Sequence, residues 1–398
     1  MSAMPGFTAK LHGEPAAFGR LRGEWNALWE AGGSPSPFTH PAWLEAWWLT
    51  YGQGRKLAIA EVRAGDELAM IAPLQVSRLP PLGARRLELL GGGPATARDW
   101  LRDPRGLGLA SANDVLVAPG QGQLAVVALA ACLAGLAPTL DAVRLAAVPA
   151  ASPLLALPEH LESGWRVRVQ ARPPHRHRID LGGGWEEFRA GLSKRQRKDL
   201  GYKVNELARA AGNELSVRRC EGSGVAEALD RFVDLHLRRW HARGKPGLLP
   251  GEDRFYRQLV AARAPLVAYK LTSGERLLAS QFGLEGRRSY APFNFAFDPA
   301  FGEQSPSHVL MQLVIQECCA RGFQSVEMVP WAMAQHWRPR PIEMRHLLLS
   351  PARPAARLSA GLTRALESVV EGAQANAAGR RARSRAAAVA ALLGQRRR

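Results

Sequence analysis

The sequence is poor in cysteine. Its 398 residues include four cysteines, of which Cys318 and Cys319 are adjacent, and none has the Cys-x-x-Cys spacing of zinc ribbons or redox motifs. A framework of disulfides, as in small secreted domains, is not indicated. The adjacent pair falls in a helical pattern, where cysteine serves as a small apolar core residue. The low cysteine content favours a reducing, cytoplasmic compartment.

Long apolar runs are also missing. The longest covers residues 124–140, is rich in alanine and contains Gly135 and Pro138. A membrane-spanning helix needs about 20 consecutive apolar residues, so this run predicts a buried helix. Residues 1–13 lack the basic-then-apolar pattern of a secretion signal.

Basic charge is abundant but concentrated. The net charge is +18, and 15 of these charges lie in residues 166–209 and 353–398. The rest of the chain is nearly neutral and has no zinc-finger spacing and no aromatic-basic RNA signature, so we expect no sequence-specific nucleic-acid partner. Residues 351–398 are predicted to form a basic tail, mobile from residue 379 on, and one hypothesis is that the tail binds an anionic membrane surface.

The sequence does contain one order of elements twice. The first half predicts helices at 18–29 and 41–51, strands at 57–63 and 67–78, a helix at 124–136 and a strand at 142–148. The second half predicts a helix at 255–264, strands at 266–271 and 276–284, a helix at 308–320 and a strand at 325–329. Aligned without gaps, residues 57–68 match 266–277 at Leu57 and Leu266 and at Gly65 and Gly274. We therefore predict two copies of one α/β unit, with domains at 1–164 and 165–350.

The start of the last helix is the most informative segment. A predicted strand at 289–297 is followed by Phe297-Asp298-Pro299, and Ser305-Pro306-Ser307-His308 then opens an apolar helix that stops at Gly322. Unpaired N–H groups and the helix dipole at such a start can bind the phosphates of a cofactor. The alternative is an ordinary helix start, with Ser305 as N-cap and Pro306 at the first position. Between the copies, residues 185–211 predict one long polar helix.

Several motifs in order resemble those of the CelD/BcsL-type acetyltransferases of the GNAT superfamily, which are relatives of the Fem-type peptidoglycan aminoacyltransferases. The motifs that carry this resemblance are Phe38-Thr39-His40-Pro41 with Trp47-Trp48, Leu235-His236-Leu237-Arg238-Arg239-Trp240, and Phe297-Asp298-Pro299 followed by Ser305-Pro306. The resemblance implies an α/β fold with two tandem GNAT-like units of mixed sheets, the first of them degenerate. It also implies acetyl-CoA or another acyl-CoA as co-substrate, with no metal, and a small-molecule or glycan acceptor. Two departures stand out: Ser307 replaces a glycine of the family, and the lysine expected after the last strand is absent.

Site residues are carried over on these matches. Acyl transfer needs a base near the nucleophile and a proton donor for the leaving thiolate. The titratable groups near the motifs are His236, His308, Glu327 and His336, with Tyr290 as the candidate acid. A structural hydrogen-bonding role is the alternative for His236. Expected cofactor contacts are Ser305, Ser307, His308, Lys194 and Arg197, although the last two also fit a solvated helix face. Expected acceptor contacts are Trp240, Trp331, Trp337 and Arg239. The alternation of His175 and His177 offers two histidines but no third ligand, so no metal site is expected.

Three functions fit the sequence. The first is an acyl-CoA-dependent N- or O-acyltransferase (acetyltransferase) in the biosynthesis of a cell-surface or cellulose-type polysaccharide, as the resemblance implies. The second is a Fem-like aminoacyltransferase that uses aminoacyl-tRNA, which predicts a basic channel along residues 194–203. The third is a non-catalytic scaffold in polysaccharide assembly.

Overall fold

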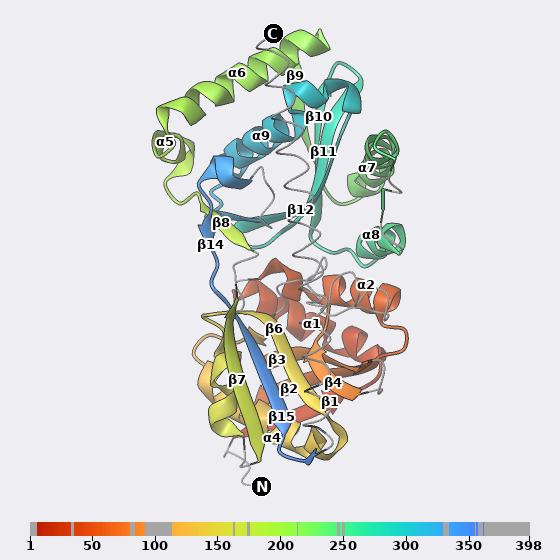
Figure 1. Ribbon diagram of the computed structural model, residues 1–398, viewed down its shortest axis with the longest axis vertical. Coiled ribbons are helices and arrows are strands. Elements are labelled where there is room, and N and C mark those ends of the chain that lie inside the picture. The colour runs from red at the N-terminus through yellow and green to blue at the C-terminus, as the bar shows by residue number, and fades with distance from the viewer. Residues whose placement is uncertain are drawn as a thin grey trace, which may run out of the picture.

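The computed structural model contains two β-sheets stacked end to end, each covered by helices (Figure 1). It describes residues 6–32, 36–79, 84–91, 114–161, 164–172, 176–212, 214–244, 247–248, 251–328, 334–354, 356 and 361. The predicted mobile tail and Trp331 lie outside these residues.

The first sheet is mixed and runs in the order β1-β2-β3-β4-β6-β15-β7, with β5 paired to β3. Its strands are β1 (Phe7–His12), β2 (Lys56–Ala64), β3 (Glu67–Leu79), β4 (Ala84–Leu89), β5 (Leu116–Val117), β6 (Ala142–Pro149), β7 (Trp165–Arg172) and β15 (Met344–Pro351). The β2–β3 hairpin is antiparallel, whereas β4 and β6, which α4 connects, are parallel.

The second sheet repeats this plan in the order β14-β8-β13-β12-β11-β10-β9. Its strands are β8 (His177–Asp180), β9 (Leu215–Cys220), β10 (Leu266–Ser273), β11 (Arg276–Glu285), β12 (Ser289–Phe297), β13 (Ser325–Met328) and β14 (Arg340–Pro341). Here too an antiparallel hairpin, β10–β11, precedes a parallel pair, β12 and β13, joined by helix α9 (Pro306–Ala320). The two copies of one α/β unit predicted from the sequence are therefore confirmed.

Helices cover both faces of the second sheet. Helix α9 lies on one face with α5 and α6 outside it, and α7 (Gly224–His241) and α8 (Glu252–Ala261) lie on the other (Figure 1). Short 3-10 helices complete the chain: η1 (Pro37–Thr39), η2 (Ala137–Thr139), η3 (Pro153–His160), η4 (Pro299–Gln304) and η5 (Ala334–Trp337).

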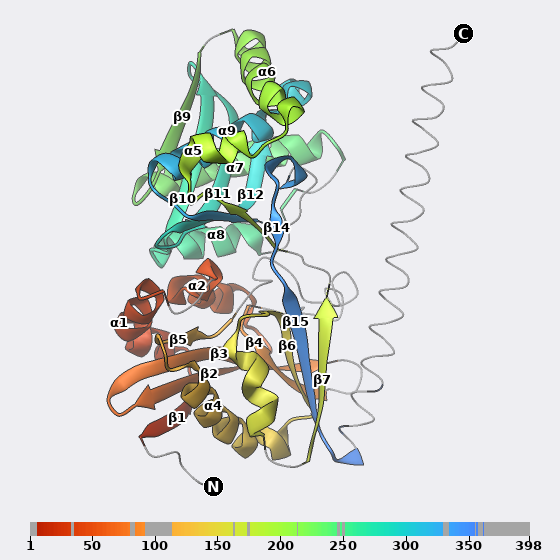
Figure 2. The same cartoon turned by 90° about the vertical axis from the view of Figure 1, so that its left-hand side faces the viewer.

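The chain crosses between the sheets twice. Strand β7 closes the edge of the first sheet, and β8, a few residues later, belongs to the second; β14 and β15 make the return crossing (Figure 2). The expected division at residue 164 therefore does not follow the sheets, because β7 and β15 pair with each other and β15 also pairs with β6. The segment 165–181, for which the sequence predicts a strand interrupted at Pro173-Pro174, forms two strands in two different sheets.

The long helix predicted at 185–211 is also two helices, α5 (Gly184–Ala190) and α6 (Lys194–Ala211). Ser193 ends the continuity because its hydroxyl accepts the Gln196 N–H (3.2 Å) while the Gln196 side chain accepts the Ser193 N–H (2.9 Å). This capping box satisfies two N–H groups that a new helix start leaves open. The apolar periodicity continues across the break and conceals it.

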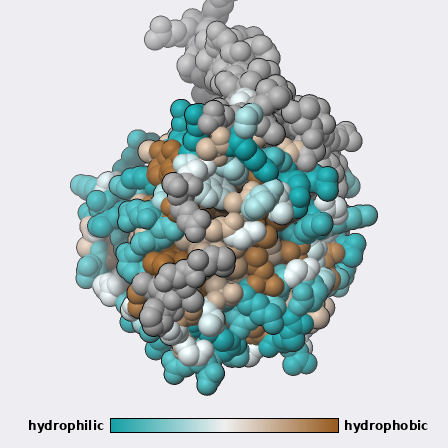
Figure 3. All heavy atoms as spheres, turned by 90° about the horizontal axis from the view of Figure 1, so that it is seen from below, coloured by the Kyte–Doolittle hydropathy of each residue, from teal (hydrophilic) through white to brown (hydrophobic). Residues whose placement is uncertain are grey.

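The apolar run at 124–140 forms helix α4 (Gly122–Leu136), which packs one face against the first sheet. In the described part of the chain, one segment, Gly122–Thr139, is apolar and long enough to span a membrane by composition alone, and a third of it is buried. Leu124 of α4 and Val167 and Val169 of β7 are exposed. Figure 3 views this end of the molecule and shows apolar patches among hydrophilic side chains.

The two halves share a core of aromatic side chains. Helices α1 (Ala16–Glu30) and α2 (Pro41–Tyr51) belong to the first half, and their buried residues form one cluster with those of α7, α8 and β12. At its centre, the fully buried Trp43 packs edge-on against Phe255 (4.8 Å between ring centroids) and Phe293 (5.3 Å). Because edge-to-face pairs add to area burial, this ring ties α2 to strand β12.

We expect Trp43→Ala to lower the free energy of unfolding by about 3–5 kcal/mol, as for other buried aromatic residues truncated to alanine. Leu49→Ala on the same helix removes a side chain that is 46% exposed and is expected to cost about 0.5 kcal/mol or less. Urea unfolding measures both. Equal costs for the two variants would contradict the shared core.

Stability is expected to depend on pH through His40. Its Nδ1 accepts the Ala42 N–H (3.2 Å) at the start of α2, and burial, with a smaller contribution from Arg22, lowers the pKa of His40 from 6.5 to about 3. The unfolded chain therefore takes up the proton first as pH falls. The contribution of neutral His40 to the free energy of unfolding is thus fully present above pH 6.5 and is lost between pH 6.5 and about 3.

His40→Asn keeps a side-chain acceptor at the N-cap, with the amide oxygen in place of Nδ1, but removes the titrating group. Urea unfolding of both proteins between pH 4 and 8 should show a smaller loss of stability toward acid in the variant. The same slope in both proteins would refute the role of His40.

Candidate active site

Strands β12 and β13 separate after a short parallel contact. They pair only at Ser289 with Ser325 and at Tyr290 with Val326, and within the described residues nothing pairs with that edge of β12 beyond Tyr290. A bulge assists the separation: on β11, Phe282 pairs with Asn294 but Gly283 pairs with Pro292, which leaves Phe293 as an extra residue. Bulges bend a strand and redirect its side chains. The gap between the strands is therefore open to a ligand.

Helix α9 begins at the open end of this gap. Ser305 is the N-cap residue and Pro306 the first helical residue, as the ordinary helix start predicts. Ser305 has a left-handed backbone (φ 54°, ψ 54°), however, and its hydroxyl makes no capping hydrogen bond. The carbonyl of Ser305 instead accepts the N–H groups of His308 (2.9 Å) and Val309 (3.2 Å). The Ser307 hydroxyl is buried and has no hydrogen-bond partner among the described residues. Buried polar atoms are usually paired, so the Ser307 hydroxyl is a ready contact for a ligand.

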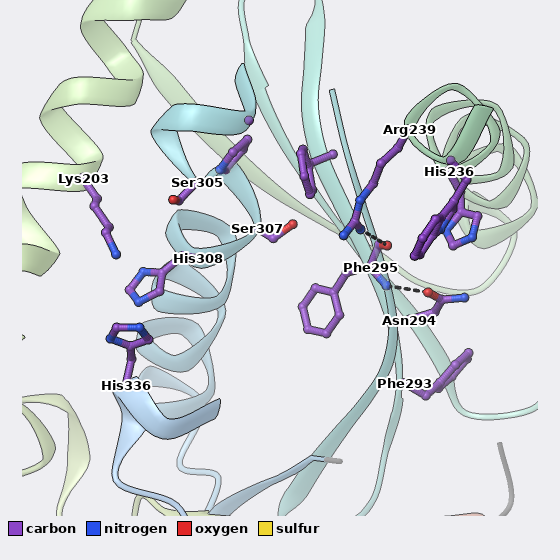
Figure 4. Close-up of a pocket in the computed structure, with 14 residues that line it drawn as sticks. Lys203, His236, Arg239, Phe293, Asn294, Phe295, Ser305, Ser307, His308 and His336 are labelled. Atoms are coloured by element: carbon purple, nitrogen blue, oxygen red, sulfur yellow. Dashed lines mark hydrogen bonds between the residues drawn. The ribbon is translucent and has the colours of Figure 1, made fainter. Parts of the chain in front are cut away.

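A cavity of about 640 Å³ surrounds the start of α9. It has two sides: Arg239, His236 and Asn294 lie around β12, and Lys203 and His308 lie on the side of α9 that faces α6 (Figure 4). Among the predicted site residues, those that line the cavity are Ser305, Ser307, His308, His336, Arg239 and Trp240.

Arg239 joins helix α7 to the end of β12. Its Nη1 donates to the Phe295 carbonyl (3.2 Å), and its guanidinium lies 4.1 Å from the centroid of the Phe297 ring. Burial, followed by the charge of Arg243, lowers the pKa of Arg239 to about 10. Arg239 therefore remains a cation at neutral pH in a largely apolar wall, where it can attract an anionic ligand.

Asn294, the polar residue beside Arg239, was not predicted from the sequence. Asn294 donates through Nδ2 to Tyr256 (2.7 Å) and to Glu252 (3.0 Å), and its Oδ1 accepts the Phe295 N–H (2.8 Å). The only signal was an asparagine within an otherwise apolar strand. His236, the next histidine on this side, is buried, and burial lowers its pKa, so its imidazole is neutral at pH 7.

On the other side of α9, the His308 ring is held by aromatic neighbours. It stacks on Trp337 (4.7 Å between centroids) and meets His336 edge-on (5.1 Å). Burial and the charge of Lys203 lower the pKa of His308 to about 4. Its imidazole is thus also neutral at pH 7.

Two predicted catalytic residues lie away from the cavity. Glu327 is buried in an ion pair with Arg176 on the far side of β13, so its charge is used in structure. Tyr290 is fully enclosed in the core, where Gln281 Nε2 donates to its hydroxyl (3.2 Å) and its ring covers Gly283. Burial raises the pKa of Tyr290 well above its usual value. Neither geometry suits an acid or base for a ligand in the cavity.

Three predicted contacts also lie elsewhere. Lys194 is exposed at the start of α6, and Arg197 Nη1 donates to the carbonyls of Ala190 (3.0 Å) and Leu192, which ties α6 to the preceding turn. Lys203, two turns further along α6, is the basic residue that reaches the cavity. Trp337 is fully buried behind His308 and cannot contact an acceptor.

Comparison with known families agrees with this geometry. Residues 194–337 match the family model described as "Acetyltransferase (GNAT) domain". This segment resembles a GNAT acetyltransferase domain. It includes α6, α7, the strands β9 to β13 and α9, and therefore the whole cavity. No curated protein sequence matches the chain.

Solved structures extend the likeness to both halves. The crystal structure of FemX superposes with a TM-score of 0.60 at 11% identity, over 85% of this chain and 98% of that one. The C-terminal domain of a putative lysylphosphatidylglycerol synthetase from Agrobacterium fabrum gives 0.51 at 10% identity, over 88% and 96%. A conserved protein of unknown function from Bacteroides thetaiotaomicron gives 0.51 at 10% identity, over 86% and 100%. These likenesses show the tandem GNAT-like fold.

We expect Arg239→Met to lower the free energy of unfolding by about 1.5–3 kcal/mol, because it removes a charged hydrogen-bond donor from β12 but keeps an apolar side chain against Phe297. Arg238→Met is the matched control: Arg238 is exposed and pairs with Asp234 one turn away, a contact worth about 0.5 kcal/mol or less. Thermal and urea unfolding would measure the difference. Arg239 has no anchoring role if the two variants are equally stable.

Proposed function

We propose that this protein is an acyl-CoA-dependent N- or O-acyltransferase whose co-substrate binds in the cavity at the start of α9. The observation that carries the proposal is the separation of β12 from β13 after two residue pairs, with the N-terminus of α9 at the open end. This arrangement lies within the segment that matches the GNAT acetyltransferase model.

The residues present fit such a ligand. The start of α9 offers N–H groups and the Ser307 hydroxyl to phosphates. Lys203 and Arg239 bring positive charge to opposite sides of the cavity. An acyl-CoA supplies the activated thioester, and the chain supplies the binding surface and the proton acceptor.

His236 is the proposed proton acceptor. Its neutral imidazole lies beside Arg239 and Asn294 on the β12 side of the cavity (Figure 4). A base must be deprotonated at the working pH to take a proton from an amine or hydroxyl, and burial keeps His236 in that state.

The acceptor is proposed to be an amino sugar or a precursor of a cell-surface polysaccharide. This rests on the resemblance to CelD/BcsL-type enzymes, and the aromatic face of Trp240 at the cavity wall is compatible with a sugar ring. The acyl group is proposed to be acetyl.

Binding of acetyl-CoA, measured by calorimetry, tests the proposal. We expect saturable binding that Ser307→Trp abolishes, because an indole at this position fills the cavity entrance, while Ser307→Ala retains most of the affinity. Ser216→Trp, on the exposed face of edge strand β9, controls for the added aromatic group. Absence of saturable binding to the folded protein, or equal binding by Ser307→Trp and Ser216→Trp, would count against the proposal.

A second candidate is a Fem-like aminoacyltransferase that uses aminoacyl-tRNA. It is favoured by the structural likeness to FemX and by the exposed basic residues at the start of α6, Lys194, Arg195 and Lys198. Filter binding with charged tRNA separates the two. Tight, salt-sensitive tRNA binding by a protein that ignores acetyl-CoA would favour this second function.

A further inference from the structure

Three potential metal ligands from distant parts of the sequence meet beside α9. Asp199 comes from α6, His308 from the first turn of α9 and His336 from η5, and one ligand atom from each lies within 4.8 Å of the other two. His308 and His336 lie together on the side of α9 that faces α6 (Figure 4). The sequence predicted no metal site, because Asp199 lies more than a hundred positions before the two histidines and no local pattern joins them.

His308 is the unusual member of this cluster. Its side chain is 5% exposed, yet neither Nδ1 nor Nε2 has a hydrogen-bond partner among the described residues. A buried imidazole without partners is costly, and stacking on Trp337 holds the ring in place.

We propose that Asp199, His308 and His336 bind a divalent transition-metal ion of the Zn²⁺ class at the edge of the cavity. Two imidazole nitrogens and one carboxylate oxygen are a donor set that such ions accept. Three protein ligands leave a fourth position open, and since His308 and His336 both line the cavity, this position faces a bound ligand.

The site closes with small movements. Metal-ligand bonds of about 2.0–2.2 Å place tetrahedral ligand atoms roughly 3.4 Å apart, so the present separations must shrink. His308 is fixed, but His336 is exposed and Asp199 partly exposed, and both can turn toward it.

Lys203 competes with the proposed metal ion for the Asp199 carboxylate. Its Nζ lies 2.9 Å from the Asp199 carboxylate one turn away, and it lines the same cavity. A cation repels this ammonium group and takes over its carboxylate partner. Metal binding therefore releases the Lys203 side chain from Asp199 toward the cavity. This release couples occupancy of the metal site to ligand binding in the cavity.

Zn²⁺ binding to the full chain, measured by competition with a chromophoric chelator, tests the site. We expect one equivalent in the wild type, and Asp199→Asn, His308→Ala and His336→Ala should each weaken binding by more than about tenfold, since even outer-shell partners of a metal are worth that much. Lys203→Met should tighten binding several-fold. His241→Ala, an exposed histidine at the end of α7, and Cys319→Ser should leave it unchanged.

Co²⁺ adds a spectroscopic test. Bound at this site, it should give the visible absorption of nitrogen and oxygen ligation without sulfur-to-metal charge transfer. If His308→Ala fails to fold, His336→Ala decides, because the His336 side chain is exposed and its removal leaves the core intact. Absence of stoichiometric binding, binding that survives in the three ligand variants, or an effect of Lys203→Met in the opposite direction would overturn the site. None of these results depends on whether acetyl-CoA binds.

Discussion

The parting of β12 from β13 is the feature on which the rest of the cavity depends. Two parallel pairs hold the strands together, and a bulge at Phe293 then bends β12 away. A regular ladder would close the gap with hydrogen bonds and leave no backbone edge for a ligand. The start of α9, the wall from Arg239 to Phe297 and the histidines beside α6 all take their positions around this opening.

The first half of the chain supports the bulged strand from behind. Phe293, the extra residue of the bulge, packs against Trp43 of α2 and lines the cavity on its other side. The crossings from β7 to β8 and from β14 to β15 add covalent ties between the sheets. The first GNAT-like copy therefore acts as a structural support for the site in the second, and loosening the shared aromatic core is expected to disturb the cavity.

The corresponding strands β4 and β12 carry different kinds of side chains in the two copies. In the first copy, the parallel pair β4 and β6 carries buried charges, with Glu88 accepting from Arg86 (2.8 Å) and from Arg55 (3.1 Å). In the second, the corresponding strand β12 presents aromatic residues and Asn294 to a cavity.

The sequence by itself determined the repeated order of helices and strands and the start of the last helix at Pro306, because apolar periodicity, proline and glycine act over a few residues. The resemblance of its motifs to a known family implied the tandem GNAT-like fold. Only the tertiary structure showed that residues 165–181 divide between two sheets. It also showed that the side chains of Glu327, Tyr290 and Trp337 are buried in the interior. It also decided the meeting of Asp199, His308 and His336. Strand pairing and side-chain burial depend on segments far apart in the chain, and no local pattern records which of them will touch.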